Sequence, residues 1–352
     1  MQTKAMYAMF SMYSVTWAQF EILFLKITRE YTMDVITDWS NTLVYLGLFF
    51  VVKKALGLLG NIYDGWRAYV LPYIYRLFKN ENFTEKFGGW AVVTGCTGGI
   101  GREYALGLAR KGMNLVLVSR SKQKLEDLEQ EIVKTYKVNT MVIVADFTQI
   151  EALDHIVSKL RESKVDIGVL VNNVGILGPH FQPFLEFDKK TVKDMIAVNI
   201  SATTVLCHEL LPDMVKKGKG AIINIASTAS YLPGPYLAEY FATKHYIHAF
   251  TEAIAIENEG TGVIIQEVDP GHVATEMTKN FAPDPTAPLA STFVASALET
   301  LGYSQRTMGY WVHGLMMLQL DLIPSHWLRM KIMKMVGKKN YRHALEKNRK
   351  SL

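Results

Sequence analysis

The amino-acid sequence predicts an α/β fold in which helices cover both faces of a doubly wound parallel sheet. Three observations lead to this prediction. Short runs rich in Val and Ile alternate with helical patterns from Phe87 onward, a glycine-rich turn follows the first run, and no internal repeat or low-complexity linker breaks the alternation. Strands that are apolar throughout are typical of parallel sheets, because helices bury both faces of such a sheet.

The elements follow one another in a regular order. The predicted strands are Trp90–Val93, Asn114–Ser119, Met141–Ala145, Gly168–Val171, Ala221–Ile225 and Val263–Val268. The predicted helices between and after them are Ile100–Lys111, Lys122–Tyr136, Ile150–Glu162, Thr191–Val215 and Ala238–Glu259. Strands that alternate with helices in this way indicate βαβ units. We therefore expect one doubly wound domain over residues 86–312.

The composition fits a large folded domain and narrows the function. Hydrophobic residues make up 49% and charged residues 20% of the 352 residues, which excludes disorder and collagen. Cys96 and Cys207 form no C-x-x-C pair, so we expect a reducing compartment and no disulfide framework. From Arg329 to the end, nine Lys or Arg face one Glu, which more than accounts for the net charge of +5. The basic character therefore belongs to a tail, which argues against a nucleic-acid-binding domain.

Residues 1–85 differ from the domain that follows. Ala5–Phe20 and Trp39–Val52 carry no charge, and Ala55–Phe78 is apolar and aromatic with a few charges. None reaches the ~20 apolar residues of an ordinary membrane-spanning helix, and no cleavage site of a signal peptide is present. Buried amphipathic helices are one interpretation. Tyr, Trp, Lys and Arg at the flanks favour the other, which is a membrane-anchoring or interfacial segment.

Residues 313–352 form the third predicted part, a membrane-associated helix followed by the basic tail. The Met-rich stretches Gly314–Leu320 and Met330–Met335 suit either a core or a site for acyl chains or lipid.

The turn after the first strand has the sequence TGCTGGIG and covers residues 94–101. Glycines at 95, 99 and 101 allow a tight bend, close approach of a pyrophosphate and packing of the helix on the strand. Backbone N–H groups at the helix start would then meet the phosphate charge. The turn predicts a Rossmann-like dinucleotide site, with contacts from Gly95, Thr97, Gly99, Ile100 and Gly101. Cys96 is interpreted as a small buried filler.

Arg120 ends the second strand and predicts the coenzyme. NAD enzymes usually place an acidic residue about 20 residues beyond the glycine turn, where it binds the ribose 2′-hydroxyl. Arg120 instead offers a fork of donors that suits a 2′-phosphate. NADP(H) is therefore the predicted coenzyme. The alternative is an ordinary solvated arginine at a helix start.

Tyr240 and Lys244 form a Tyr-x-x-x-Lys pair on one face of a predicted helix. A lysine ammonium beside a phenol lowers the pKa of the phenol and makes it a usable proton donor. Ser227, just past the fifth strand, could donate a hydrogen bond to a substrate carbonyl. Tyr75 and Lys79 match the same spacing, but they precede the nucleotide fold and are interpreted as interfacial or packing residues.

Metal binding is not predicted. His245 and His248 follow Lys244 on the same helix, but no third ligand stands at a telling spacing.

This combination resembles the short-chain dehydrogenase/reductase family from roughly Phe87 to Val312. The motifs that carry the resemblance are TGCTGGIG, Asp146 after the third strand, NNVG from Asn172, AVNIS with Asn199, NIAS with Ser227, YFATK with Tyr240 and DPGHVAT from Asp269. The resemblance implies a catalytic core of Ser227, Tyr240 and Lys244, with Asn199 supporting a proton relay through water. It also implies that Asp146 and Asn172 lie by the adenosine half of the coenzyme, and that Val273 and Thr275 lie by the nicotinamide amide.

Within the family, the sequence is similar to the membrane-bound 17-beta-hydroxysteroid dehydrogenases of types 3 and 12, a branch that includes long-chain 3-oxoacyl-coenzyme A reductases. The segments KFGGWAVVTG, NLVLVSRSKQKL and TMGYWVHGLM carry this similarity. The chain also resembles the hydroxysteroid dehydrogenase-like branch, whose vertebrate members lack the active-site tyrosine, whereas Tyr240 is present here. Gly98 stands where the first branch commonly has Asp, and DPGH is closer to the general family, so the substrate subtype stays open.

The resemblance implies an NADPH-dependent ketone reductase with a lipid-like substrate, a long-chain 3-oxoacyl-coenzyme A of fatty-acid elongation ahead of an oxosteroid. The alternative of another class is a nucleotide-binding scaffold with weak turnover or none. The expected partners are the substrate and a membrane, without nucleic acid, and a homodimer is compatible with this interpretation. The apolar N-terminus and the ending Arg349–Leu352 favour the endoplasmic reticulum membrane with a cytosolic catalytic domain, and the mitochondrion is the alternative.

Overall fold

The structure is a computed structural model that describes residues 22, 39–76, 82–149, 151–278, 282–323 and 325–350. The chain divides into two compact units, Met1–Tyr63 and Asp64–Leu352. The uncharged run Ala5–Phe20, Lys79 and the last two residues of the basic ending lie outside the described residues. The division predicted at residues 85 and 312 stays a prediction.

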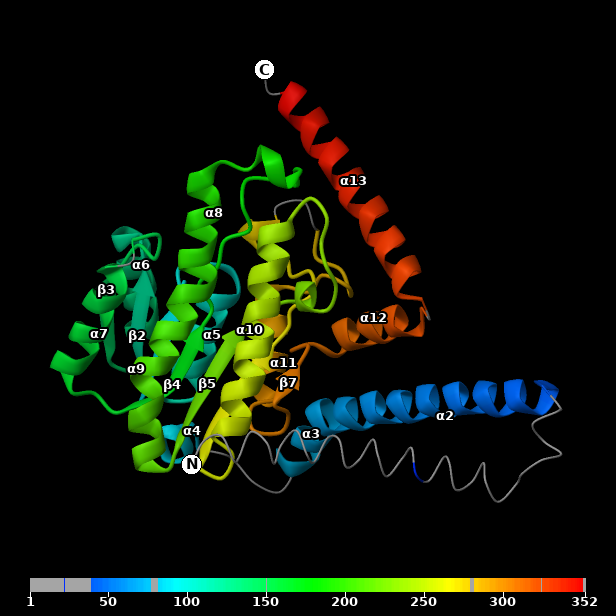
Figure 1. The fold of residues 1–352 in the computed structure, drawn as a ribbon. Coiled ribbons are helices and arrows are strands. Elements are labelled where there is room, and N and C mark those ends of the chain that lie inside the picture. Colours follow the sequence, from blue (N-terminus) through cyan, green and yellow to red (C-terminus); the bar gives the residue numbers. More distant parts are fainter. Residues whose placement is uncertain are drawn as a thin grey trace, which may run out of the picture. The chain divides into compact units, whose positions relative to one another are not determined.

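Seven parallel strands form one sheet in the second unit (Figure 1). The strands are β1 Trp90–Thr94, β2 Asn114–Ser119, β3 Thr140–Val144, β4 Ile167–Asn172, β5 Gly220–Ile225, β6 Val263–Val268 and β7 Arg306–Thr307. Their order across the sheet is β3-β2-β1-β4-β5-β6-β7. The chain thus builds outward from β1 to β3 and then returns to the other side of β1. Open sheets of this kind bind ligands at the carboxyl ends of the strands where the order reverses, here β1 and β4. The predicted α/β class with a doubly wound, Rossmann-like sheet is confirmed.

Helices cover both faces of this sheet. They are α5 Gly99–Arg110, α6 Lys122–Tyr136, α7 Glu151–Ser163, α8 Lys189–Ile196, α9 Ala202–Lys217, α10 Ala238–Glu257 and α11 Ala290–Glu299. Buried side chains of α5, α6 and α11 share one core, those of α7 and α9 share the other, and partly buried side chains of α10 pack against the second core. Within β1, Val93 belongs to the first core and Val92 to the second, since successive side chains on a strand point to opposite faces.

Every strand and helix predicted over residues 86–268 is present, with ends within two residues of the prediction. The predicted helix Thr191–Val215 is α8 and α9 joined by a π-helical turn, Ala197–Ser201, which hydrophobic spacing does not reveal. The strand β7 was not predicted, because two residues carry no periodic pattern.

The N-terminal helix corrects one sequence expectation. The two apolar stretches that Lys53 and Lys54 separate in the sequence belong to one continuous helix, Thr42–Tyr75, of 34 residues. This stretch lies within three elements that follow one another without a break, α2 Trp39–Gly65, the π-helical turn Trp66–Val70 and α3 Leu71–Arg76. By length and composition this helix could cross a membrane, with a mean hydropathy of 1.8 and no buried residue in its most apolar window. The second helix that passes the same test, Lys189–Lys217, is 44% buried and packs on the sheet, so it is a core helix.

Two further helices follow the sheet, α12 Trp311–Leu322 and α13 His326–Lys350. The helix α13 contacts the loop that precedes α10. The ring of Tyr341 stacks on Tyr236 with centroids 5.4 Å apart, and the Tyr341 hydroxyl donates to Glu186 Oε1 at 2.8 Å. A Cβ on Gly337 would lie 2.6 Å from the carbonyl oxygen of Pro235, so only glycine permits this approach. The C-terminal helix is therefore packed against two loops of the second unit.

Candidate active site

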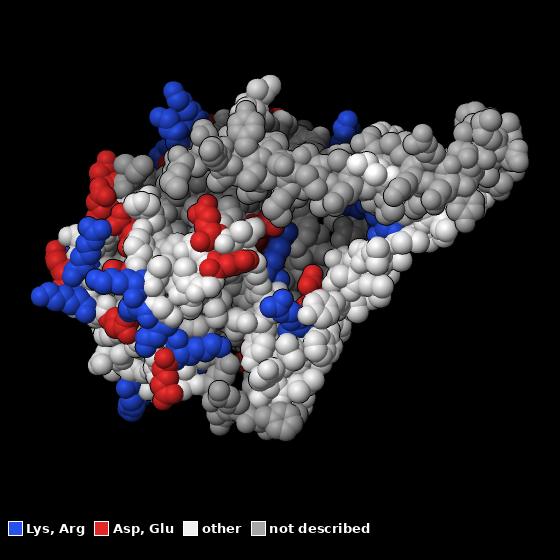
Figure 2. Space-filling view, turned by 60° about the horizontal axis from the view of Figure 1, so that its bottom comes forward, with Lys and Arg blue, Asp and Glu red and all other residues white. Residues whose placement is uncertain are grey.

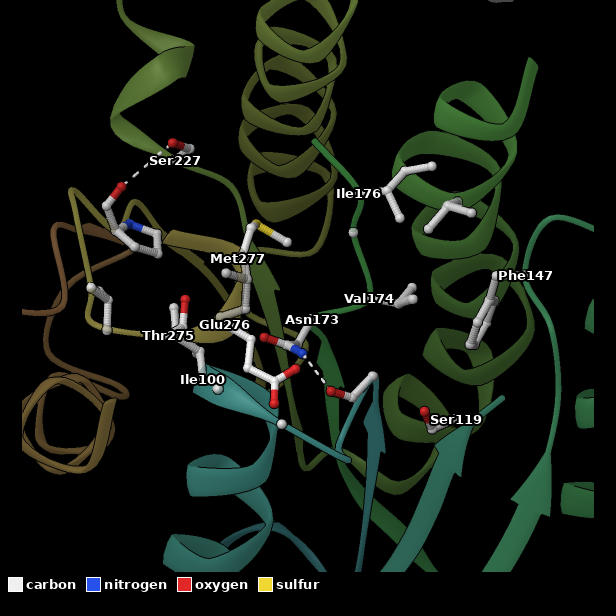
Figure 3. Close-up of a pocket in the computed structure, with 18 of the residues that line it drawn as sticks. Ile100, Ser119, Phe147, Asn173, Val174, Ile176, Ser227, Thr275, Glu276 and Met277 are labelled. Carbon is white, nitrogen blue, oxygen red and sulfur yellow. Dashed lines mark hydrogen bonds between the residues drawn. The ribbon is translucent and has the colours of Figure 1, made fainter. Parts of the chain in front are cut away.

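A pocket of about 330 Å³ lies at the carboxyl ends of the central strands (Figure 3). The glycine turn after β1, the end of β2, the segment after β4 and the segment after β6 all contribute residues. Tyr240 and Lys244 reach it from α10, and Ser227 reaches it from the end of β5. This is the edge at which the reversal of strand order predicts a ligand.

The glycine turn is shaped so that a side chain would not fit at its critical position. A Cβ on Gly101 would lie 2.3 Å from Asn173 Nδ2 and 2.4 Å from the carbonyl oxygen of Gly95. Gly95 and Gly99 have φ of 64° and 53°, in the left-handed region that favours glycine. No side chain caps the start of α5 at Gly98. Backbone N–H groups at an uncapped helix N-terminus suit a phosphate, and they face this pocket.

Asn173 holds this turn in place, and the sequence did not single it out. Its Nδ2 donates to the carbonyl oxygens of Thr94 at 3.0 Å and Gly95 at 3.2 Å (Figure 3). The side chain of Asn172 is buried in the interior, where Nδ2 donates to Asn224 Oδ1 at 2.8 Å, so it does not line the pocket, and its place by the adenosine half stays a prediction. Successive residues at a strand end point to opposite sides, so the second asparagine of NNVG lines the pocket and the first does not.

Polar groups line the part of the pocket beside β2 and β3. The exposed Arg120 follows β2 and lines the pocket together with Ser119 and Asp146. The Ser119 hydroxyl is hydrogen-bonded to Thr97 Oγ1 at 2.9 Å, which ties the glycine turn to the end of β2. Asp146 Oδ1 accepts from the backbone N–H of Thr148 at 3.1 Å. A cationic fork beside hydroxyl donors, with no acidic residue at the end of β2, fits a ribose that carries a phosphate.

Ser227, Tyr240 and Lys244 meet on the other side of the pocket. Ser227 Oγ accepts from the N–H of Ala229 at 3.1 Å and lies 3.5 Å from the carbonyl oxygen of Pro270, to which it donates (Figure 3). Lys244 Nζ donates to the carbonyl oxygen of Ile225 at 2.9 Å and lies 5.8 Å from the centre of the Tyr240 ring. The three side chains come from two elements that the sequence pattern had placed correctly.

Burial shifts the pKa values of Tyr240 and Lys244 in directions that the sequence did not predict. Burial raises the pKa of Tyr240, and the Ser227 hydroxyl beside it acts in the opposite direction. The predicted lowering of the Tyr240 pKa by Lys244 is therefore not what the structure shows. Burial also lowers the pKa of Lys244 to about 8, although the charges of Asp269 and Glu267 act in the opposite direction. Desolvation outweighs the attraction between charges at this depth.

Asn199 lies behind Lys244 in the π-helical turn rather than in the pocket wall. Its Nδ2 donates to the carbonyl oxygen of Ile176 at 2.9 Å and to Thr243 Oγ1 at 3.0 Å, and its Oδ1 accepts from the N–H of Ile176 at 2.8 Å. Both N–H groups of the amide are thus used within the protein. Its remaining capacity for water is on the acceptor side.

Val273 and Thr275 line the pocket in the segment after β6, and their place by the nicotinamide amide stays a prediction. The same segment adds two residues that the sequence did not single out. Glu276 and Met277, from the short helix Glu276–Thr278, extend into the pocket (Figure 3). The sequence does not predict these two residues, because they belong to no motif of fixed spacing and their loop has no periodic pattern.

The remaining sequence candidates lie outside the pocket. His245 Nδ1 lies 2.9 Å from the carbonyl oxygen of Phe241, and His248 Nδ1 lies 2.9 Å from Glu267 Oε2. Among the described residues, no group of three or more His, Cys, Asp and Glu side chains could hold a metal ion. Tyr75 is 54% exposed on α3, with its ring 5.9 Å from that of Tyr303. Cys96 is buried, and burial raises the pKa of its thiol to about 12, which agrees with its interpretation as a filler.

Comparison with known proteins shows the family to which the chain belongs. A family model described as short chain dehydrogenase matches residues 89–286. The chain is 35% identical over 313 residues to human inactive hydroxysteroid dehydrogenase-like protein 1, covering 88% of this chain and 92% of that protein. It is 40% identical over 266 residues to human very-long-chain 3-oxoacyl-CoA reductase, covering 75% and 84%. A solved short-chain dehydrogenase from Sphingobium yanoikuyae in complex with NADPH matches with a TM-score of 0.55 and 30% identity, covering 59% and 82%.

The fold and the pocket define a nucleotide-binding α/β protein with a serine, a tyrosine and a lysine at the carboxyl edge of its sheet. The chain belongs to the short-chain dehydrogenase family of oxidoreductases.

Proposed function

We propose that this chain is an NADPH-dependent reductase of a ketone in a lipid-like substrate. The observation that carries the proposal is the convergence of Ser227, Tyr240 and Lys244 on one pocket with the glycine turn and Arg120. A group that donates a proton, a group that orients the substrate oxygen and a cradle for a dinucleotide are the parts that such a reduction needs.

The coenzyme fits the residues that are present. The uncapped start of α5 and the glycines of the turn would hold the pyrophosphate, and Arg120 would hold the 2′-phosphate. Thr97 and Ile100 lie in the same turn and would also contact the coenzyme. Asp146 would contact the adenosine half, and Val273 and Thr275 would contact the nicotinamide amide. The similar short-chain dehydrogenase from Sphingobium yanoikuyae was solved in complex with NADPH, which supports this choice of coenzyme. When bound, the coenzyme supplies the hydride for the ketone carbon.

The chain's own residues would deliver the proton. Ser227 would donate a hydrogen bond to the ketone oxygen and hold it beside the Tyr240 hydroxyl. Tyr240 would transfer its proton to that oxygen as negative charge develops there, so that hydride and proton together convert the ketone to an alcohol. Lys244, when charged, would stabilise the phenolate that remains. Asn199 would hold a water for proton resupply through an acceptor atom, because both of its amide N–H groups are used.

A long-chain 3-oxoacyl-coenzyme A is the preferred substrate, ahead of an oxosteroid. The 40% identity to the human very-long-chain 3-oxoacyl-CoA reductase supports the acyl substrate. The pocket also presents Ile176, Val198 and Met277, which are apolar side chains near the proposed reacting groups. A second candidate function is a nucleotide-binding scaffold without turnover. It is favoured by the human relative whose name includes the word inactive, whereas the presence of Ser227, Tyr240 and Lys244 favours the reductase.

We further propose that the protein is held at a membrane. The helix Thr42–Tyr75 would be the anchor, and α12 and α13 would lie on the lipid surface. Trp311 and Leu315 on α12 and Trp327 and Met335 on α13 are exposed, and the last turns of α13 are rich in Lys and Arg. Exposed Trp and cationic side chains on one helix suit the headgroup region of an anionic bilayer. On the face shown in Figure 2, basic and acidic side chains of the second unit are interspersed rather than gathered in the single-sign patch of a nucleic-acid-binding surface.

The endoplasmic reticulum, with the catalytic domain in the cytosol, is the proposed location, and the mitochondrion is the alternative. A homodimer is compatible with the proposal.

The test is NADPH oxidation by detergent-purified full-length protein with a panel of 3-oxoacyl thioesters of increasing chain length and of oxosteroids. Turnover of a long-chain thioester supports the preferred substrate, and turnover of an oxosteroid alone supports the alternative substrate. Tight NADPH binding without turnover of any ketone supports the scaffold.

A further inference from the structure

A cluster of charged and polar side chains around two buried carboxylates contacts the segments that hold Ser227. We call it the Arg306 cluster; it consists of Arg306, Glu267, Asp269, His248 and Ser230. Glu267 is the fifth residue of β6 and is 2% exposed, and Asp269 follows β6 and is fully buried. The strand β7 brings Arg306 into register with Glu267. None of these residues lines the pocket.

The guanidinium of Arg306 makes a separate contact with each of its nitrogen atoms. Nε donates to Asp269 Oδ2 at 2.7 Å and lies 3.5 Å from Glu267 Oε1. Nη2 donates to Ser230 Oγ at 3.0 Å, and Nη1 lies 3.2 Å from His248 Nε2. His248 Nδ1 in turn lies 2.9 Å from Glu267 Oε2. The planar guanidinium thus reaches partners in three fixed directions, and a lysine ammonium cannot reproduce this geometry.

Two of these contacts lead to the two segments that hold Ser227. Asp269 directly precedes Pro270, whose carbonyl oxygen accepts from Ser227 Oγ at 3.5 Å and from the N–H of Thr228 at 3.0 Å. Ser230 ends the short helix Thr228–Ser230, and its N–H donates to the carbonyl oxygen of Ser227 at 2.9 Å. Arg306 therefore contacts both the turn that carries Ser227 and the neighbouring segment after β6.

Stability alone is a weak explanation for this arrangement. Burying two carboxylates beside a partly buried guanidinium carries a desolvation cost, and well-packed apolar side chains often replace such groups without loss of stability. What the cluster adds is a fixed distance between the segment after β6 and the turn after β5. A misplacement of about 1 Å near a reacting group can lower a rate by about 100-fold.

We propose that Arg306 is a positioning residue of the reductase, which clamps Asp269 to Ser230 and thereby aims the Ser227 hydroxyl at the substrate oxygen. The inference rests on the proposed function, because it requires Ser227 to be the group that orients that oxygen.

The test is the kinetics of the full-length protein with the substrate found in the panel. Arg306→Gln should lower kcat by roughly 10- to 100-fold, because the Ser227 hydroxyl is then no longer held in place beside the substrate oxygen. Arg306→Lys keeps the charge but not the fork and should recover part of the rate. Arg161→Gln is the matched control, because Arg161 pairs with Glu209 on the exposed faces of α7 and α9, away from the site. It should leave kcat and KM unchanged.

A double-mutant cycle separates positioning from a general structural role. If Arg306 acts through Ser227, then Arg306→Gln should lower kcat little or not at all in a Ser227→Ala background. Equal effects in both backgrounds overturn the inference. Ser230→Ala removes one arm of the clamp with less disturbance, and it tests the same point if Arg306→Gln fails to fold. It should lower kcat in the same direction, and an unchanged kcat overturns the inference. An unchanged kcat in Ser227→Ala itself overturns instead the proposed role of Ser227.

Discussion

Tyr240 is the proton donor of the proposed reaction, so removal of its hydroxyl is the most direct test of the mechanism. Tyr240→Phe keeps the buried ring and removes only the acid. General acid catalysis contributes about 10²–10⁴-fold, and kcat should fall by that factor while NADPH affinity is retained. The measurement is steady-state reduction together with a coenzyme titration. Tyr75→Phe is the matched control, because Tyr75 has the same sequence spacing but lies outside the pocket. A wild-type rate in Tyr240→Phe would contradict the assignment and favour the scaffold.

Arg120 tests the choice of coenzyme. Arg120→Ala should weaken NADPH binding by about 1.5–3 kcal/mol, because a charged hydrogen-bonding partner of the phosphate is lost, and it should change NADH binding little. Dissociation constants for both coenzymes, measured by calorimetry, check this. Lys134→Ala, on the exposed face at the far end of α6, should change neither constant. Equal losses for the two coenzymes would remove Arg120 from the phosphate site.

Lys244 predicts the pH dependence of reduction. Burial lowers its pKa to about 8, whereas the pKa of Tyr240 is raised, so Tyr240 stays protonated over the pH range in which Lys244 loses its charge. The charged lysine stabilises the phenolate that forms, so kcat/KM for reduction should fall as the pH rises through about 8. A pH profile from 6 to about 10 for the free enzyme measures this. A rate that stays flat across that range would exclude the deprotonation of Lys244 as a controlling step.

At the scale of elements, the glycine turn offers a comparison within one motif. Gly101→Ala forces a Cβ against Asn173 Nδ2 and the carbonyl oxygen of Gly95, whereas a Cβ on Gly98 meets no atom within 4 Å and the backbone there is extended. Overpacking of this kind costs typically 1–3 kcal/mol. Gly101→Ala should therefore lower the melting temperature and weaken NADPH binding, and Gly98→Ala should do neither. Thermal melts with and without NADPH measure both effects. Similar behaviour of the two variants would mean that the turn is not sterically constrained.

Most of the central elements could be predicted because their signals are local. The stretch Leu115–Val118 within β2 is apolar throughout, and this pattern is typical of a strand that is buried on both faces. The pocket residues after β1, β2 and β5 were predictable because motifs of fixed spacing place them at strand ends. The side-chain direction of Asn172 and the role of Asn173 could not be predicted, because a shift of one residue along the strand decides which of the two side chains faces the pocket. The Arg306 cluster could not be predicted from the sequence either. It depends on the pairing of β7 with β6, and the two residues of β7 carry no periodic pattern.

At the scale of the whole molecule, the membrane proposal depends on the helix Thr42–Tyr75. If that helix spans the bilayer, the full-length protein should stay in the membrane pellet after extraction with alkaline carbonate, because carbonate removes proteins that are held by charge alone. Immunoblots of the pellet and supernatant check this. Release into the supernatant would reject integral anchoring and leave only the surface contacts proposed for α12 and α13.

Both cysteines lie in the core, and this has a practical consequence for locating the chain in a cell. Cys96 and Cys207 are buried, and the pKa of each thiol is raised to about 12. Thiolate is the form that reacts with maleimides, so the folded native protein should be nearly inert to them. A single cysteine introduced at an exposed position, such as Leu185→Cys, would then be the only reactive group in the folded chain. Labelling of sealed vesicles with a membrane-impermeant maleimide would show directly which side of the bilayer the second unit occupies.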